Sequence, residues 1–214
     1  MARFFPDRGV VAVVLLFAGA LTSALAASPT LDKKTPIDWK EGERHCFKAD
    51  FNAGTITLCD VTLTQGASTR ITADNASAKG LSDNNNGEWL LTGKVHIEFD
   101  NVILDADSAT VTFAQDRLQK VHVKGAPSRF SQQLKDPSRR NQGRAATIDY
   151  DSQKDVLNLM GDTWYTDGRN VVETAAFTYN LNDGSIFSSE RVKGTIQPEK
   201  RVPAPRTPDR ATSQ

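Results

Sequence analysis

Apolar and polar side chains alternate along most of the chain, and this two-residue period is typical of β-strands. The alternation recurs in three similar units, at residues 55–79, 88–112 and 156–181. Each unit has two alternating runs separated by a small residue, then a polar turn and a third run. Residues 119–130 resemble a degenerate further copy. Since one unit buries too little apolar surface to fold alone, the repeat predicts stacked or rolled β-structure.

The small residue between the first two runs is Cys59, Gly93 or Gly161, at spacings of 34 and then 68 residues. Glycine inside a strand marks a bulge, a bend or a close backbone approach. We therefore expect a corner at each of these positions, where a long strand turns from one sheet to the other. The predicted fold class is all-β: an open β-jelly roll (β-taco) built from repeated strand units. Cys59 is expected to point inward with the apolar side chains that follow it.

One face of the alternating runs supplies the expected apolar interior. Its members are Ile56, Leu58, Val61, Leu63, Ile71, Leu91, Val95, Ile97, Phe99, Val102, Leu104, Val111, Phe113, Val121, Val123, Phe130, Ile148, Leu157, Leu159, Val171, Phe177 and Tyr179. Ile37 and Trp39 alternate as an edge strand would, and Ser131–Gln142 is predicted to be a polar loop. The same alternation fits either a sealed core or a roll whose walls separate enough to admit acyl chains.

The chain begins with the pattern of an export signal. Arg3 and Arg8 precede the apolar run at residues 10–21, which is too short to span a membrane. An A-x-A cleavage pattern ends at Ala26, although an uncleaved anchor is the alternative. The expected organisation is a signal peptide (1–26), a polar lead (27–35), a β-domain (36–196) and a disordered Pro/Arg-rich tail (197–214).

An exported chain meets an oxidising compartment, which bears on the two cysteines. Folding the segment between Cys46 and Cys59 about Asn52-Ala53 places the two residues opposite each other on antiparallel strands. Directly opposed side chains have their Cβ atoms about 4.5–5.5 Å apart, close to the spacing of a disulfide. The sequence therefore predicts a Cys46–Cys59 disulfide. A turn at Ala53-Gly54 would break this register and leave two buried thiols.

Charge and motifs exclude several classes of function. Lys and Arg number 26, as do Asp and Glu, so bulk charge does not favour nucleic acid. His45, His96 and His122 lie far apart without ligand-spaced partners, so no metal site is expected. No glycine-rich phosphate loop follows a strand, and no cofactor is expected. The many carboxylates offer no pair that stands out, although a carboxylate-based enzyme acting on polysaccharide remains the alternative from another class.

Several segments together resemble the OstA-like family of periplasmic proteins. They are QGASTRITAD at 65–74, GKVHIEFDN at 93–101, GAPSRFSQQ at 125–133, GRAATIDYD at 143–151 and DVLNLMGDTWYTDG at 155–168. The resemblance covers roughly Pro36–Lys200. The chain departs from the family pattern by an extra repeat before GAPSRF, by Cys59 in place of a glycine, and by Thr174-Ala175 in place of a Gly-Asp pair.

The resemblance implies a periplasmic bridge that binds lipopolysaccharide through its lipid A acyl chains and catalyses nothing. Its implied partners are an inner-membrane LptC-type anchor, an outer-membrane LptD-type translocon and further copies of itself, stacked head to tail. Ile37 and Trp39 would lie at the mouth of the groove and Phe130 on the inner wall of a central strand. Phe99, Phe113, Ile148 and Leu159 complete the predicted lipid-binding groove. Two further alternatives stay open: a membrane-anchored partner of the same fold, and a structural β-repeat protein that binds no lipid.

Overall fold

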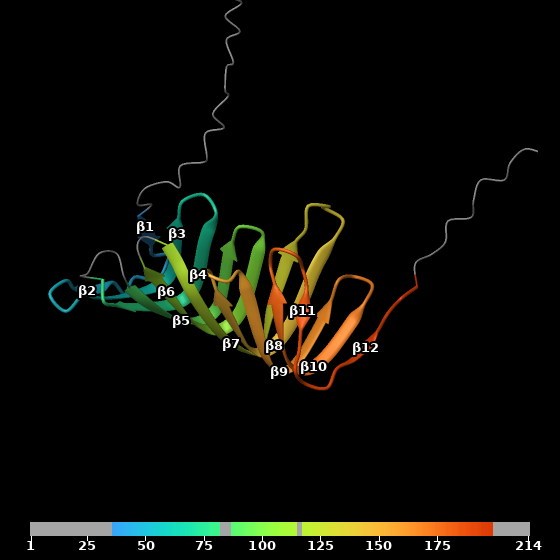
Figure 1. Ribbon diagram of the computed structural model, residues 1–214. Helices are drawn as coiled ribbons and strands as arrows, with labels where there is room; N and C mark the ends of the chain where they lie inside the picture. Colours follow the sequence, from blue (N-terminus) through green and yellow to red (C-terminus); the bar gives the residue numbers. More distant parts are fainter. Residues whose placement is uncertain (1–35, 82–86, 115–116, 199–214) are drawn as a thin grey trace, which may run out of the picture. The chain divides into compact units, whose positions relative to one another are not determined.

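The computed structural model describes residues 36–81, 87–114 and 117–198 (Figure 1). These residues form strands and turns and no helix, so none of them belongs to a helix able to cross a membrane. The all-β prediction is confirmed. The predicted signal peptide, the polar lead and residues 199–214 of the predicted tail lie outside the described residues.

The described strands form one 12-stranded antiparallel sheet. They are β1 (Ile37–Lys40), β2 (Lys48–Asp50), β3 (Thr55–Gln65), β4 (Thr69–Lys79), β5 (Gly87–Phe99), β6 (Val102–Ala114), β7 (Arg117–Gln133), β8 (Arg140–Asp151), β9 (Val156–Thr166), β10 (Val171–Asn180), β11 (Ile186–Phe187) and β12 (Lys193–Thr195). Strands β3 to β10 follow one another in sequence order, β1 and β2 both pair with β3, and β11 and β12 both pair with β10. The sheet is open because the strands at its two ends do not pair with each other.

The long strands bend at the positions that the repeat predicted. In β5, Gly93 has φ +79° and Lys94 has φ 46°; in β9, Gly161 has φ +82° and Asp162 has φ 47°. This pair of left-handed residues inserts a bulge, and the register shifts at the same point in the neighbouring strand pairs. A Cβ on Gly93 would lie 2.8 Å from the Cβ of Asp74, so the close approach of two strands also requires glycine there.

The corner in β3 differs from the expectation. Asp60, at φ 47°, is the left-handed residue, while Cys59 before it has ordinary strand conformation. Leu58 and Val61 both point inward, because the bulge at Asp60 inserts one residue into the alternation. Cys59 therefore lies on the outer face, and the prediction that it points inward is wrong.

The corners divide the sheet into two walls that face each other (Figure 1). Wall A comprises residues 62–65, 69–73, 95–99, 102–106, 128–133, 140–145, 163–166 and 171–174, with β1 and β12 along its edges. Wall B comprises residues 55–59, 75–79, 87–92, 108–114, 117–124, 147–151, 156–160 and 176–180, with β2 and β11 along its edges. Each repeat unit is thus a hairpin of two bent strands, and its first two runs form a single strand.

The apolar core lies between the walls and contains nearly all of the predicted interior residues. Val171 is the exception, since it is only half-buried on the strand beside β12. Trp89, Tyr150 and Tyr165 are also buried, although they are not among the expected interior residues. The fold is therefore an open sheet that bends around its own apolar side chains, which confirms the prediction of an open β-jelly roll.

The predicted loop at Ser131–Gln142 is shorter than expected. Strand β7 continues to Gln133 and β8 begins at Arg140, and these two residues are opposite each other in the ladder. The polar composition misled the prediction because Gln132 and Asn141 are buried in the wall rather than solvated. Their side chains take part in the contact between the walls that is described below.

Candidate functional site

The central groove residues predicted from the sequence meet between the walls. Phe99, Phe113, Phe130, Ile148 and Leu159 all point inward, and each is at most 3% exposed. In the structure they pack on one another and on buried tyrosines, as where the ring centroids of Phe130 and Tyr179 lie 5.2 Å apart. Their role in contacting lipid stays a prediction, because the structure shows them as an apolar interior.

Gly143 explains how one large ring fits into this interior. It lies directly opposite Phe130 in the β7–β8 ladder. A Cβ on Gly143 would overlap the Phe130 ring. The glycine therefore allows the ring to lie flat against the neighbouring strand, in the middle of wall A.

The end of the roll next to β1 contains a cavity of about 170 Å³. Its lining comes from both walls and consists of Pro36, Ile37, Trp39, Ile56, Leu81, Gly87 and Trp89. Ile37 is half-buried and Trp39 is 40% exposed, with the Trp39 ring stacked on Phe47 at a centroid distance of 5.4 Å. The structure thus places the two predicted edge residues at the end of the apolar interior, which we call the N-terminal mouth.

Trp89 lines the N-terminal mouth, and its side chain is 2% exposed. Its Nε1–H is inaccessible and has no hydrogen-bond partner within the described part of the chain. Burying an unpaired N–H costs on the order of 1–3 kcal/mol, so this donor weakens the packing at the mouth.

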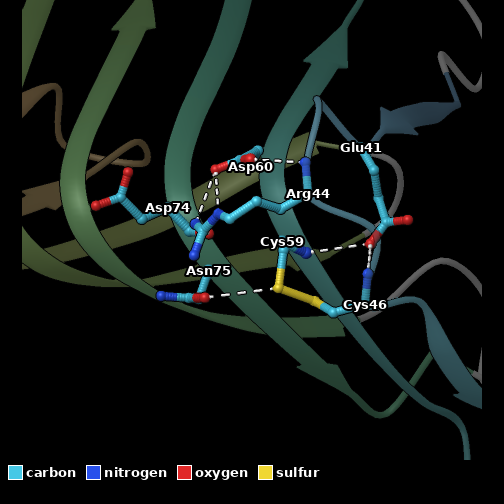
Figure 2. Close-up of polar contacts among 7 residues, drawn as sticks. All are labelled: Glu41, Arg44, Cys46, Cys59, Asp60, Asp74 and Asn75. Atoms are coloured by element: carbon cyan, nitrogen blue, oxygen red, sulfur yellow. Dashed lines mark hydrogen bonds and ion pairs between the residues drawn. A yellow bond between two sulfur atoms is a disulfide. The ribbon is translucent and has the colours of Figure 1, made fainter.

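A short loop at residues 41–46, which we call the N-terminal clasp, fastens β1 and β2 to the corner of β3 (Figure 2). The Arg44 side chain donates to Asp60 Oδ1, with Nη2 at 2.7 Å, and to the Asp74 carbonyl oxygen at 2.6 Å. The Arg44 backbone N–H donates to Asp60 Oδ2 at 3.0 Å. The hydrogen bonds from Arg44 hold the pKa of the Asp60 carboxyl below its usual range. Arg44 thus stabilises the negative charge on the residue that forms the corner.

A carboxylate and a disulfide complete the N-terminal clasp. Glu41 Oε1 accepts hydrogen bonds from the backbone N–H groups of Cys46, at 3.3 Å, and Cys59, at 3.2 Å (Figure 2). The Cys46–Cys59 disulfide joins the same two residues, whose Cα atoms lie 5.6 Å apart. The β2–β3 register pairs Lys48 with Thr57, which centres the hairpin on Asn52-Ala53 as predicted. The N-terminal edge of the sheet is therefore fixed covalently at its corner.

At the edge where the strands of each wall end, polar side chains of the two walls contact each other. We call this edge of each wall its rim, and we call the side chains of Gln132, Asn141 and Tyr179 the polar rim. From wall A, Asn141 Nδ2 donates to the Tyr179 hydroxyl at 2.6 Å, and that hydroxyl donates to Gln132 Oε1. Gln132 Nε2 in turn donates to the Leu181 carbonyl oxygen at 2.8 Å. Burial raises the pKa of Tyr179, against the opposing effect of the bond from Asn141, so the hydroxyl stays protonated at neutral pH.

A second polar contact joins the rims nearer to the N-terminal mouth. The Leu118 backbone N–H on wall B donates to Gln65 Oε1 on wall A at 3.2 Å. The walls are thus held together by apolar packing inside and by hydrogen bonds along the rim. Hydrogen bonds of this kind contribute about 0.5–1.5 kcal/mol each, so the rim separates at a lower cost than the core.

The three histidines do not form a metal centre. His96 Nδ1 contacts Asp105 Oδ1 at 2.6 Å and its Nε2 contacts Glu98 Oε1 at 3.0 Å, while His122 contacts Asp149. Within the described ranges, no group of three or more His, Cys, Asp or Glu side chains could hold a metal ion. Partial burial lowers the pKa of His96, but its hydrogen bonds to the two carboxylates outweigh this effect and leave the pKa above its ordinary value.

The sequence analysis did not identify the N-terminal clasp or the polar rim. A signal for the first existed, because Asp60 occupies the position in the repeat that Lys94 and Asp162 hold after the corner glycines. No such signal existed for the rim, since Gln132 and Tyr179 come from strands far apart in the sequence. Only the folding of the two walls brings those side chains together.

The described residues thus form an open, bent antiparallel sheet around an apolar interior. The sequence family described as "LptA/(LptD N-terminal domain) LPS transport protein" matches residues 70–185, more than half of the chain. The chain therefore belongs to this family of lipopolysaccharide transport proteins. The match confirms the resemblance to LptA-like proteins and the prediction of a transport protein without catalytic activity.

A solved structure is also similar to this chain. It is that of LptH from Pseudomonas aeruginosa, described as the LptA homologous periplasmic component of the conserved lipopolysaccharide transport device. The two sequences are 18% identical, the alignment covers 78% of this chain and 99% of LptH, and the TM-score is 0.42. No curated protein matches the sequence.

Proposed function

We propose that this protein carries lipopolysaccharide across the periplasm, with the acyl chains of lipid A held between walls A and B. The observation that carries the proposal is the cavity at the N-terminal mouth, whose lining comes from both walls and includes Ile37, Trp39 and Trp89. Each CH₂ group that moves from water into such an interior contributes about 0.8 kcal/mol. A transport family and an apolar interior with an accessible end together favour a lipid carrier over a sealed structural protein.

Loading a lipid requires the walls to move apart, because the interior side chains are packed in the structure. The walls would separate at their rims, because the contacts there are polar, such as that of Gln132 with Tyr179, and not interdigitated apolar side chains. The interior side chains would then contact the acyl chains instead of contacting each other. They are Phe99, Phe113, Phe130, Ile148 and Leu159. The disulfide of the N-terminal clasp would keep the loop at residues 41–46 attached to the corner of β3 while the rims separate.

The ends of the sheet favour assembly into a chain of copies. At one end β1 and β2 leave an unpaired edge, and at the other end β11 and β12 do so within the described residues. Exposed edges can add strands from other molecules, and contacts between two different ends give an open chain of copies when the rotation between them does not close a ring. We propose that copies stack head to tail between an inner-membrane LptC-type anchor and an outer-membrane LptD-type translocon. Light scattering over a range of protein concentrations tests this assembly, and a single fixed size would contradict it.

Photocrosslinking tests the lipid-binding proposal. A benzophenone amino acid at Trp39 in the purified mature protein should label added lipopolysaccharide. The matched control is the same substitution at Leu90, which is 50% exposed against 40% for Trp39 but lies next to Trp89 on the outer face. A second control at Asp167 probes a half-buried position in the loop between β9 and β10. Labelling confined to Trp39 supports the proposal, whereas equal labelling at Leu90, or none at Trp39 in a folded protein, refutes it.

A further inference from the structure

The outer face of wall A carries a row of side chains that the proposed lipid groove does not use. The ladder pairs Asp105 with Arg129, Arg129 with Arg144, and Arg144 with Trp164 on successive strands. Because side chains directly opposite each other on one face of a sheet lie about 4.5–5.5 Å apart at Cβ, these residues are immediate neighbours. Two arginines therefore lie side by side on the outside of the wall.

This row borders a depression of about 470 Å³ on the outer face. Arg140 adds a third guanidinium from the start of β8, and Ser131 and Gln142 supply neutral polar groups. The half-buried Trp164 ring forms part of the lining. The depression thus runs from the middle of wall A to the rim, where β7 ends and β8 begins.

The three guanidinium groups have no carboxylate partner among the described residues. The Arg144 guanidinium lies over the Trp164 ring, at 5.5 Å from its centroid, and Arg140 Nη2 donates to the neutral Gln133 Oε1 at 3.1 Å. The nearest carboxylate in the row, Asp105, is hydrogen-bonded to His96 instead. Like charges directly opposite each other destabilise a sheet, so the pairing of Arg129 with Arg144 has a cost that a bound anion would remove.

We propose that this depression binds the phosphate groups of a phosphorylated saccharide. Guanidinium groups present paired N–H donors that match phosphate oxygens, and an indole ring with neutral amide and hydroxyl groups suits the sugar. The choice of saccharide rests on the proposed function, since the headgroup of a lipopolysaccharide has this chemistry. Its location fits as well: Gln132 and Asn141 of the polar rim lie on the inner face of the same strand ends, so a headgroup leaving the rim reaches Arg140 first.

The test uses the full mature chain and a glucosamine disaccharide that carries phosphates and no acyl chains. Isothermal titration calorimetry should detect binding that weakens as salt is added, because the contacts are between charges. Arg129→Gln and Arg144→Gln should each weaken binding on the order of tenfold, since each removes charge-assisted hydrogen bonds. Arg117→Gln is the matched control, because Arg117 is an exposed arginine on the same strand as Arg129 but on wall B.

Three outcomes would overturn the inference. The first is no binding by the folded protein, and the second is equal weakening by Arg117→Gln. The third is an affinity for inorganic phosphate, or for an acidic peptide, that equals the affinity for the disaccharide, which would remove the assignment to a saccharide. Because the probe has no acyl chains, its failure leaves crosslinking at Trp39 unaffected, and the two proposals fail separately.

Discussion

Replacing Tyr179 with phenylalanine would test whether the polar rim holds the two walls together. The substitution keeps the ring, which packs on Phe130, and removes only the hydroxyl. That hydroxyl accepts from Asn141 and donates to Gln132, so two buried polar groups lose their partner. Each such loss costs about 1–3 kcal/mol, so we expect a total of at least about 2 kcal/mol.

The matched control is Tyr165→Phe in the same aromatic cluster. The Tyr165 and Tyr179 rings lie 5.6 Å apart, but the Tyr165 hydroxyl makes no hydrogen bond within the described part of the chain. Its removal should change the free energy of unfolding by less than about 0.5 kcal/mol. For a domain of this size, the loss at Tyr179 should lower the melting temperature by at least about 4 °C.

Urea unfolding monitored by circular dichroism measures both variants. If the rim also controls lipid loading, Tyr179→Phe should speed the labelling of lipopolysaccharide at Trp39, whereas Tyr165→Phe should leave the rate unchanged. Equal free energies of unfolding for the two variants would refute the idea that the rim hydrogen bonds contribute to stability. A destabilised Tyr179→Phe protein that loads lipid no faster would refute the role of the rim in loading.

Three further perturbations probe other parts of the fold. Reducing the Cys46–Cys59 disulfide should lower the free energy of unfolding by about 3 kcal/mol, as expected for a closed loop of this length, and identical denaturation curves with and without reductant would contradict this. Gly161→Ala should destabilise the protein more than Gly168→Ala. Both glycines have positive φ, but only at Gly161 would the new Cβ lie close to another atom, at 2.8 Å from the Cβ of Ala146. Equal melting temperatures of the two variants would show that the close approach at the corner has no cost. The pKa of His96 is raised in the folded state, so its contribution to stability is fully present below the unfolded pKa of about 6.5 and is lost as the pH rises through the folded pKa. His96→Gln should remove this part of the pH dependence of stability. An NMR titration that gives a lowered pKa for His96 would refute this prediction.

The sequence by itself determined the class of fold and most of the interior. Alternation with a period of two decides which side chains of a strand face inward, because neighbours on a strand point to opposite sides. The repeated Gly93 and Gly161 located the corners, since left-handed backbone favours glycine. The register of the Cys46–Cys59 hairpin also followed from the sequence, because a short antiparallel connection leaves few alternatives.

Only the tertiary structure decided which side chains meet across the walls and along them. The exception at Cys59 arises because the bulge at Asp60 inserts one residue into the alternation: the repeat located this corner, but the side to which Cys59 points depends on which residue takes the left-handed conformation. The polar rim joins β7 and β8 to β10, and the outer arginine row depends on the register of four strands. Such contacts depend on strand pairing between residues far apart in the sequence. A polar residue can therefore be predicted to lie in a loop and yet be a buried hydrogen-bond partner in the fold. Gln132 is the example: its neighbours in the chain are polar, but its position opposite Tyr179 decides its role.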